Sequence, residues 1–407
     1  MTRSSGLLSG GSLVAAGMVG MNVAVYGLTI VAARSLEPRD LGALTALMGV
    51  LLMGNVMSLG LQASSARRLA VHPEDRATII GTVARVAPAI ALGTGLIGGL
   101  VAVALAEPLR LPSLWPAVLT GATLAPLTMM GAAAGVAQGT ERWRMLTAIY
   151  LGGGLGRLVF GVGALLIETS VTSAMIGIAI GAWVPVLVGL PLLRGRSSDA
   201  GTTSSRPFVR EAVLGSHALL AYFVLSNLDA LLARIVLDPH DSGLYASGLI
   251  LSKAAVFFPQ FVSIVVFPVL ARDETSRSRH LAAGAVAGLG ALAVLVTALL
   301  PQLALILVGG DRYAEVAGRL WLFALAGSCL AVVHLLVYDA LARHAHGVAV
   351  AVWSAAATLT AAVLLLDLSI TGLVSTVAGV AAVLAVVVMV APSTSAAPDA
   401  ARDRVQY

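Results

Sequence analysis

The stretch EPRDLG at Glu37–Gly42 returns about two hundred residues later as DPHDSG at Asp238–Gly243. In both copies an acidic residue precedes a proline, an aspartate follows two residues later, and a glycine closes the stretch. Each copy lies between two long apolar segments, where proline ends one helix and glycine relieves a tight re-entry into the next. The repeat therefore predicts a chain that is built from two related halves.

The composition indicates a membrane protein. Of 407 residues, 58% are hydrophobic and 11% are charged, whereas soluble domains carry about 25% charged residues. A soluble protein of this size could not bury so much apolar surface, so we expect lipid to surround the chain. The basic residues fall in short loops between apolar segments, which argues against a nucleic-acid partner. The single cysteine, Cys329, excludes an intramolecular disulfide framework.

Twelve apolar segments are long enough to cross a bilayer, since a membrane helix needs roughly 20 apolar residues. We therefore predict an all-α polytopic membrane protein with twelve transmembrane helices in two parallel six-helix bundles. The predicted spans are 10–33, 41–66, 78–106, 116–138, 145–167, 171–193, 212–237, 244–271, 281–308, 316–342, 348–366 and 371–391.

The distribution of basic residues supports this count. With the N-terminus in the cytoplasm, 16 of the 25 basic side chains fall in cytoplasmic segments, five in outer segments or at their edges, and four within spans. The positive-inside rule predicts such an asymmetry, and one missed span would scramble it. We expect a multi-pass protein of the cell membrane, plasma or inner, with both termini in the cytoplasm.

A polar stretch divides the spans into two sets of six. This stretch, RGRSSDAGTTSSRPFVRE at 194–211, is rich in serine, threonine and glycine, which predicts a flexible cytoplasmic linker. We therefore predict an N-terminal bundle at 1–193, a C-terminal bundle at 212–392 and a disordered cytoplasmic tail at 393–407. Because each half has an even number of spans, the halves have the same orientation and form a parallel repeat.

The loops argue against an enzyme. No loop has room for a catalytic or nucleotide-binding domain, and we predict no catalytic residue and no metal site. The glycine-rich GGGLG at 152–156 interrupts a span without a preceding strand, so it does not fit a phosphate-binding loop. A membrane glycan polymerase or glycosyltransferase would need an acidic cluster or a sizeable outer loop, and neither is present.

Ionisable side chains at membrane depth are costly and indicate functional sites by default. Arg157 lies near the middle of the fifth span, too deep to reach either surface easily. Asp229 and Lys253 lie at similar depth on the two helices that flank the second turn. They either neutralise one another, or Asp229 binds a coupling cation together with Asn227. Lys253 is the only lysine in the chain.

Two further arginines lie nearer the ends of their spans. Arg85 and Arg234 are each close enough to a surface to extend their charged group into the interface, or else line a cavity. The candidates for a water-filled cavity are therefore mostly cationic: Arg157, Lys253, Arg85 and Arg234. Such a chamber between two six-helix halves would attract an anion, and the planar guanidinium suits phosphate.

Two segments carry a resemblance to a known family. VAARSLEPRDLGALTAL at Val31–Leu47 and SNLDALLARIVLDPHDSGLYASGLILSKAAVFFPQFVSIVVFPVLAR at Ser226–Arg272 resemble the polysaccharide flippases of the multidrug/oligosaccharidyl-lipid/polysaccharide exporter (MOP) superfamily. The NLD triplet, GLYA after the turn and the PQ…FP series carry the likeness, over about 65 residues. The chain departs from the family where Leu41 replaces the usual aromatic residue.

The resemblance implies a MATE-like fold and a secondary transporter. It implies that the chain flips a polyprenyl-pyrophosphate-linked oligosaccharide from the inner to the outer leaflet for cell-surface polysaccharide biosynthesis, by alternating access. A proton or sodium gradient would drive it, with Asp229 as the coupling carboxylate and no other cofactor. The expected partners are membrane lipids and the pathway's glycan polymerase or glycosyltransferases, and we expect a monomer. The alternative is a small-molecule or drug exporter of the MATE or major facilitator type.

Overall fold

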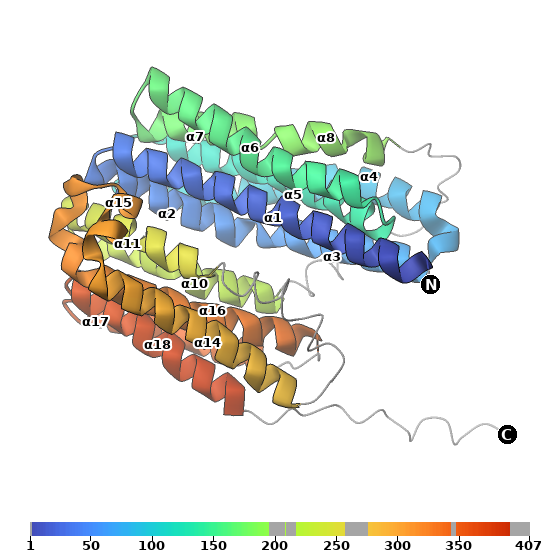
Figure 1. The fold of residues 1–407 in the computed structure, drawn as a ribbon. Helices are drawn as coiled ribbons and strands as arrows, with labels where there is room; N and C mark the ends of the chain where they lie inside the picture. The colour runs from blue at the N-terminus through green and yellow to red at the C-terminus, as the bar shows by residue number, and fades with distance from the viewer. Residues whose placement is uncertain (1, 195–207, 209–216, 257–275, 343–346, 391–407) are drawn as a thin grey trace.

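The computed structural model describes residues 2–194, 208, 217–256, 276–342 and 347–390. Every regular element within these residues is a helix (Figure 1). Eleven helical segments in the described ranges are long and apolar enough to cross a membrane. The predicted eighth span, 244–271, begins in helix α11 (Pro239–Val256), and its remainder lies outside the described residues. The all-α polytopic membrane fold is confirmed.

The first half follows the predicted spans closely, but two of them are broken. The second span bends out of regular helix at Asn55, and the sixth is interrupted at Ala182 and Trp183, just before Pro185. By contrast, the helices that contain Pro88 and Pro126 continue through them. The helices of this half are α1 (Thr2–Ser35), α2 (Pro38–Gly54), α3 (Val56–Val71), α4 (Arg76–Ala104), α5 (Trp115–Gly139), α6 (Trp143–Ile167), α7 (Val171–Gly181) and α8 (Val184–Leu193), with a 3-10 turn, η1 (Pro73–Asp75).

The second half differs most from the prediction at its third span. The predicted span 281–308 is two helices, because Pro301 cannot continue a helix that ends at Leu299. The second of them is short and leads into the 3-10 helix η2 (Asp311–Arg319). The other elements are α10 (His217–Val236), α14 (Ser276–Leu299), α15 (Pro301–Val308), α16 (Leu320–Ala342), α17 (Gly347–Leu365) and α18 (Ile370–Val390).

The two halves repeat the same pattern of helix packing. In the first half, α1 packs on α6, the broken span α2–α3 on α5, α4 on α5, and α6 on α7. In the second half, the equivalent pairs are α10 with α17, α11 with α16, α14 with α16, and α17 with α18. The duplication that the repeated turn predicted is therefore present in the tertiary structure.

The halves meet through α2, which packs against both α10 and α11. Figure 1 shows the two groups of helices together at the end where α1 passes to α2 and α10 passes to α11. Toward the end where α1 begins and α18 ends, the groups splay apart. We call these the turn end and the termini end. Farther from the turn end, Gly49 on α2 packs against Asn227 on α10, and α3 also contacts α10.

The segments predicted as linker and tail are described only in part. Within 194–211 the structure describes Arg194 and Phe208, and the tail 393–407 lies outside the described residues. Phe208 is 1% exposed and packs in the hydrophobic core of the first half, with the guanidinium of Arg68 5.0 Å from the centre of its ring. The linker is therefore attached to the first half at this residue.

Candidate functional site

The principal polar cluster lies inside the second half, between α10 and α11. Asn227 and Asp229 stand on α10, and Tyr245 and Lys253 stand on α11. Because α10 and α11 run antiparallel from the second turn, residues at similar distances from the turn reach the same depth. The chain therefore places an acid, an amide and an amine in one buried region, as the sequence suggested.

Asp229 and Lys253 have different partners. The ammonium of Lys253 donates to the side-chain oxygen of Asn227 at 2.8 Å and to the main-chain carbonyl of Ser226. The carboxylate of Asp229 accepts the hydroxyl of Tyr245 at 3.3 Å and the amide of Ala230 at 2.9 Å. Within the described residues, the two charged groups therefore share no direct hydrogen bond, and the amine is bound by Ser226 and Asn227 of α10.

Burial makes this cluster energetically demanding. Asp229 and Asn227 are each 2% exposed, and a buried charge is tolerated only when it is paired and hydrogen-bonded. A carboxylate offers about four acceptor positions, and Tyr245 and Ala230 occupy two of them in the described structure. The carboxylate of Asp229 can therefore take up a proton, or it can coordinate a small cation together with neighbouring oxygens.

An aromatic group extends the cluster toward the termini end. The ring of His334 on α16 lies 4.7 Å from the ring of Tyr222 and 4.7 Å from the ring of Tyr338, measured between centroids. The hydroxyl of Tyr222 and Nδ1 of His334 are buried and have no hydrogen-bond partner among the described residues. Nothing in one sequence shows that α10 and α16 bring these rings together.

Arg157 lies inside the first half. It shares a helix face with Gly153, which packs against Met130 of α5, and with Tyr150, whose hydroxyl accepts a hydrogen bond from Gln62 at 2.7 Å. This face of α6 points into the bundle and not toward lipid. Nε of Arg157 donates to the carbonyl of Gly153 at 3.1 Å, the one hydrogen bond that its side chain makes to the described residues. The other guanidinium nitrogens can therefore bind an anion.

The structure separates the remaining two arginines from these interior groups. Arg85 is exposed on the face of α4 that also carries the exposed Leu92 and Leu96, which is a lipid-facing stripe. Arg234 is 4% exposed and donates to the carbonyls of Leu109 and Arg110 in the other half. Of the four cations proposed for one chamber, Arg157 and Lys253 therefore lie inside separate bundles, Arg85 faces outward and Arg234 joins the halves at the turn end.

Known structures share this architecture. A multidrug resistance MATE family transporter of the MOP superfamily in an inward-facing conformation aligns with a TM-score of 0.69 at 11% identity, over 92% of this chain and 96% of that one. An outward-facing MATE transporter of the same superfamily gives 0.59 at 12% identity, over 94% of each chain. A eukaryotic MATE transporter gives 0.53 at 15% identity, over 95% of this chain and 97% of that one. The fold is that of the MATE transporters. No protein-family model and no curated protein matches the sequence.

The MATE fold fixes where the polar groups lie relative to its two halves. Arg157 occupies the interior of one six-helix half, and the cluster of Asp229, Asn227 and Lys253 occupies the interior of the other. The halves are duplicated in fold but differ in interior charge, because the first carries Arg157 on its fifth span and the second carries Asp229 and Lys253 on its first two spans. Each half can therefore recognise a different chemical group.

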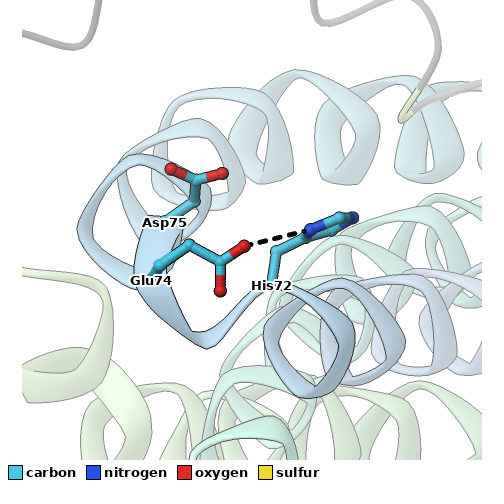
Figure 2. Close-up of side chains that lie close together, drawn as sticks. All are labelled: His72, Glu74 and Asp75. Atoms are coloured by element: carbon cyan, nitrogen blue, oxygen red, sulfur yellow. Dashed lines mark hydrogen bonds and ion pairs between the residues drawn. The ribbon is translucent and has the colours of Figure 1, made fainter.

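One further group of potential metal ligands lies on a loop of this MATE fold. His72, Glu74 and Asp75 place their ligand atoms within 4.8 Å of one another between α3 and α4 (Figure 2). All three side chains are exposed, and Nδ1 of His72 already contacts the carboxylate of Glu74 at 3.3 Å. Exposed acidic groups of this kind are ordinary features of a helix connection, and we assign them no function.

Proposed function

We propose that this chain is a secondary transporter that moves a polyprenyl-pyrophosphate-linked oligosaccharide from the inner to the outer leaflet of the cell membrane. The MATE fold and the duplicated halves, which touch at the turn end and splay toward the termini end, support alternating access. In this proposal both termini are cytoplasmic, so the structure corresponds to a state open to the cytoplasm. A thiol or protease probe that reached 194–211 from outside would contradict this orientation.

Arg157 carries the substrate assignment. It is an interior guanidinium whose described hydrogen bond uses only Nε, which leaves the planar pair of terminal nitrogens for an anion. A pyrophosphate crossing hydrocarbon loses its hydration at a large cost, and a fixed arginine reduces that cost. The lipid tail would stay in the bilayer while the head group passes along the interior of the protein. The proposed substrate class rests on this interior positive charge, whose hydrogen bond to the described residues is to a main-chain carbonyl.

A drug exporter is the second candidate. The solved structures with this fold include multidrug resistance MATE transporters, and a fold supports several substrates. A cationic drug would need a free carboxylate in the interior. The interior carboxylate of Asp229 is 2% exposed, hydrogen-bonded to Tyr245 and close in sequence to the amide that binds Lys253. This arrangement favours an anionic substrate over a cationic one.

The cluster around Asp229 is the proposed coupling site. A proton on Asp229, or a sodium ion held by its carboxylate and adjacent oxygens, would change the charge balance with Lys253 inside the second half. Because α11 also packs against α2 of the first half, a change at this cluster can alter how the halves meet. No other cofactor is required, and the transporter acts as a monomer beside the glycosyltransferases or polymerase that make and use its substrate.

A flipping assay tests the proposal. Vesicles containing the protein would carry a lipid-linked oligosaccharide with a fluorophore on its sugar, and a membrane-impermeant quencher would report transfer between leaflets. We expect Arg157→Gln to lower the rate about tenfold or more, because a charge-assisted contact to phosphate is lost. The matched control is Arg85→Gln, which removes a lipid-facing arginine and should leave the rate within about twofold.

Two outcomes would contradict this assignment. If the wild-type protein moved no labelled glycan but exported a cationic dye against its gradient, the drug exporter would be the correct function. If glycan moved and Arg157→Gln behaved like Arg85→Gln, the chain would be a flippase but Arg157 would not bind its head group.

A further inference from the structure

The turn end is closed by arginines that cross between the halves. From the first half, Nη1 of Arg110 donates to the carbonyl of Leu237 at 3.0 Å, and Nη2 donates to the carbonyl of Ile235 at 3.4 Å. These carbonyls belong to the last turn of α10 and the residue after it. Arg110 lies in the connection between α4 and α5, so this contact joins the middle of one half to the first helix of the other.

The second half makes the equivalent contact in return. Nη1 of Arg312, in the connection that leads to α16, donates to the carbonyl of Leu36 at 2.6 Å. Leu36 stands directly before Glu37, and Leu237 stands directly before Asp238, so the two acceptors occupy the same position in the two repeated turns. The contact is therefore duplicated along with the fold.

A second pair of contacts runs in the opposite direction. Arg234, near the end of α10, donates from Nε to the carbonyl of Leu109 at 2.8 Å and from Nη2 to the carbonyl of Arg110 at 3.0 Å. Arg34, near the end of α1, donates from Nη2 to the carbonyl of Ile306 at 3.0 Å. Each half thus donates hydrogen bonds to the other half from two arginines, one near the end of its first helix and one in the connection between its third and fourth spans. In the first half these are Arg34 and Arg110, and in the second half they are Arg234 and Arg312.

The carbonyl groups that accept these hydrogen bonds explain why a positively charged side chain binds them. The last four carbonyls of a helix lack partners within it and lie at the negative end of the helix dipole. Ile235 supplies such a carbonyl, Leu36 and Leu237 supply the carbonyl of the residue directly after a helix, and the arginines that bind these three carbonyls belong to the opposite half. When the halves separate at this end, these carbonyls lose their partners together, so the contacts favour closure as a set.

We propose that Arg34, Arg110, Arg234 and Arg312 form a clamp that holds the turn end shut and so positions the two halves for access from the termini end. The inference rests on the proposed alternation between two states, but on no particular substrate. These are positioning residues, because they bind main chain and not cargo. Opening of the turn end requires the clamp to release, and weakening it shifts the protein toward the state open at that end.

The test measures the distance between the turns directly. Spin labels at Glu37→Cys and His240→Cys, both exposed positions, would be placed in a Cys329→Ser background and measured by pulsed electron resonance in vesicles. We expect one predominant short distance in the parent protein. In Arg110→Ala/Arg312→Ala, the ratio of the longer to the shorter population should rise by about fivefold or more.

The matched control removes two arginines from the same end that have no hydrogen bond to the other half among the described residues. Arg39 lies 3.9 Å from the carboxylate of Asp40 in its own turn, a contact that remains in the Glu37→Cys background, and Arg319 is exposed at the end of η2. Arg39→Ala/Arg319→Ala should leave the distance distribution unchanged, whereas Arg110→Lys/Arg312→Lys should restore part of the short population. For a variant that folds poorly, the single variants Arg110→Ala and Arg312→Ala should each give a smaller shift in the same direction.

The two proposals fail separately. An unchanged distance distribution in all the clamp variants would overturn the clamp, whatever the flipping assay showed. A shift of the same size in the control variant would also overturn it, because the effect would then reflect lost positive charge alone. A clamp-dependent shift in a protein that moved no glycan would support the clamp and leave the substrate assignment contradicted.

Discussion

Gly243 in the second turn packs directly against the carbonyl oxygen of Pro38 in the first. Gly42 is the equivalent residue in the first turn. A Cβ atom added to Gly42 would lie 2.8 Å from the hydroxyl oxygen of Ser242. The sequence suggested that these glycines relieve a tight re-entry of the chain. In the described residues, positive-φ glycines are Gly309 and Gly310, so the repeated glycines serve the close approach of α2 and α11 and not an unusual backbone angle.

Gly243→Ala should separate the halves at the turn end. The added methyl group would meet the Pro38 backbone, which cannot rotate away as a side chain could. Overpacking of this kind typically costs 1–3 kcal/mol, so we expect a variant less stable by about 2 kcal/mol. Thermal unfolding in detergent measures the change.

Gly284→Ala is the control for this substitution. It lies in α14, where an added Cβ meets nothing within 4 Å. Because alanine is the better helix former by about 1 kcal/mol, this variant should be as stable as the parent or slightly more stable. Equal stability of Gly243→Ala and Gly284→Ala would show that α2 and α11 have room to move apart without loss.

The fold could be predicted almost completely from the sequence, and the site only in part. Apolar length and the positions of arginines identify membrane helices, because lipid imposes the same requirement on each of them. The repeated turn located the duplication. The breaks at Asn55 and Leu300 were missed, since apolar composition does not distinguish a continuous helix from a broken one.

The site depends on which helix faces are turned toward each other. Depth alone correctly brought Asp229 and Lys253 into one cluster, because both are counted from the same turn. It could not show that Asn227 and Ser226 would bind the amine, or that Arg85 faces outward on α4. Those outcomes depend on helix rotation, which packing between distant segments determines.

The charges of Asp229 and Lys253 should be coupled in stability even without a direct hydrogen bond. Lys253→Met leaves Asp229 buried without a nearby positive charge, and Asp229→Asn leaves the amine without a negative one. In the double variant neither charge remains uncompensated. We therefore expect its loss of stability to be smaller than the sum of the two single losses by about 1 kcal/mol or more. Thermal unfolding of the parent, the two single variants and the double variant measures this coupling. Additive losses would show that the hydrogen bonds of Asn227 and Ser226 stabilise the charged amine without help from Asp229.

Asp229→Asn should uncouple transport from the ion gradient. The amide keeps the shape of the carboxylate and can still accept the hydroxyl of Tyr245, but it can neither take up a proton at physiological pH nor balance a cation. The parent should move its substrate faster in vesicles with an imposed proton or sodium gradient than in vesicles without one. In the variant, the ratio of these two transport rates should fall to about one. Asp75→Asn, which alters an exposed carboxylate in the loop after α3, should keep the full dependence. Gradient dependence that survived Asp229→Asn and disappeared in another acidic variant would move the coupling site away from α10.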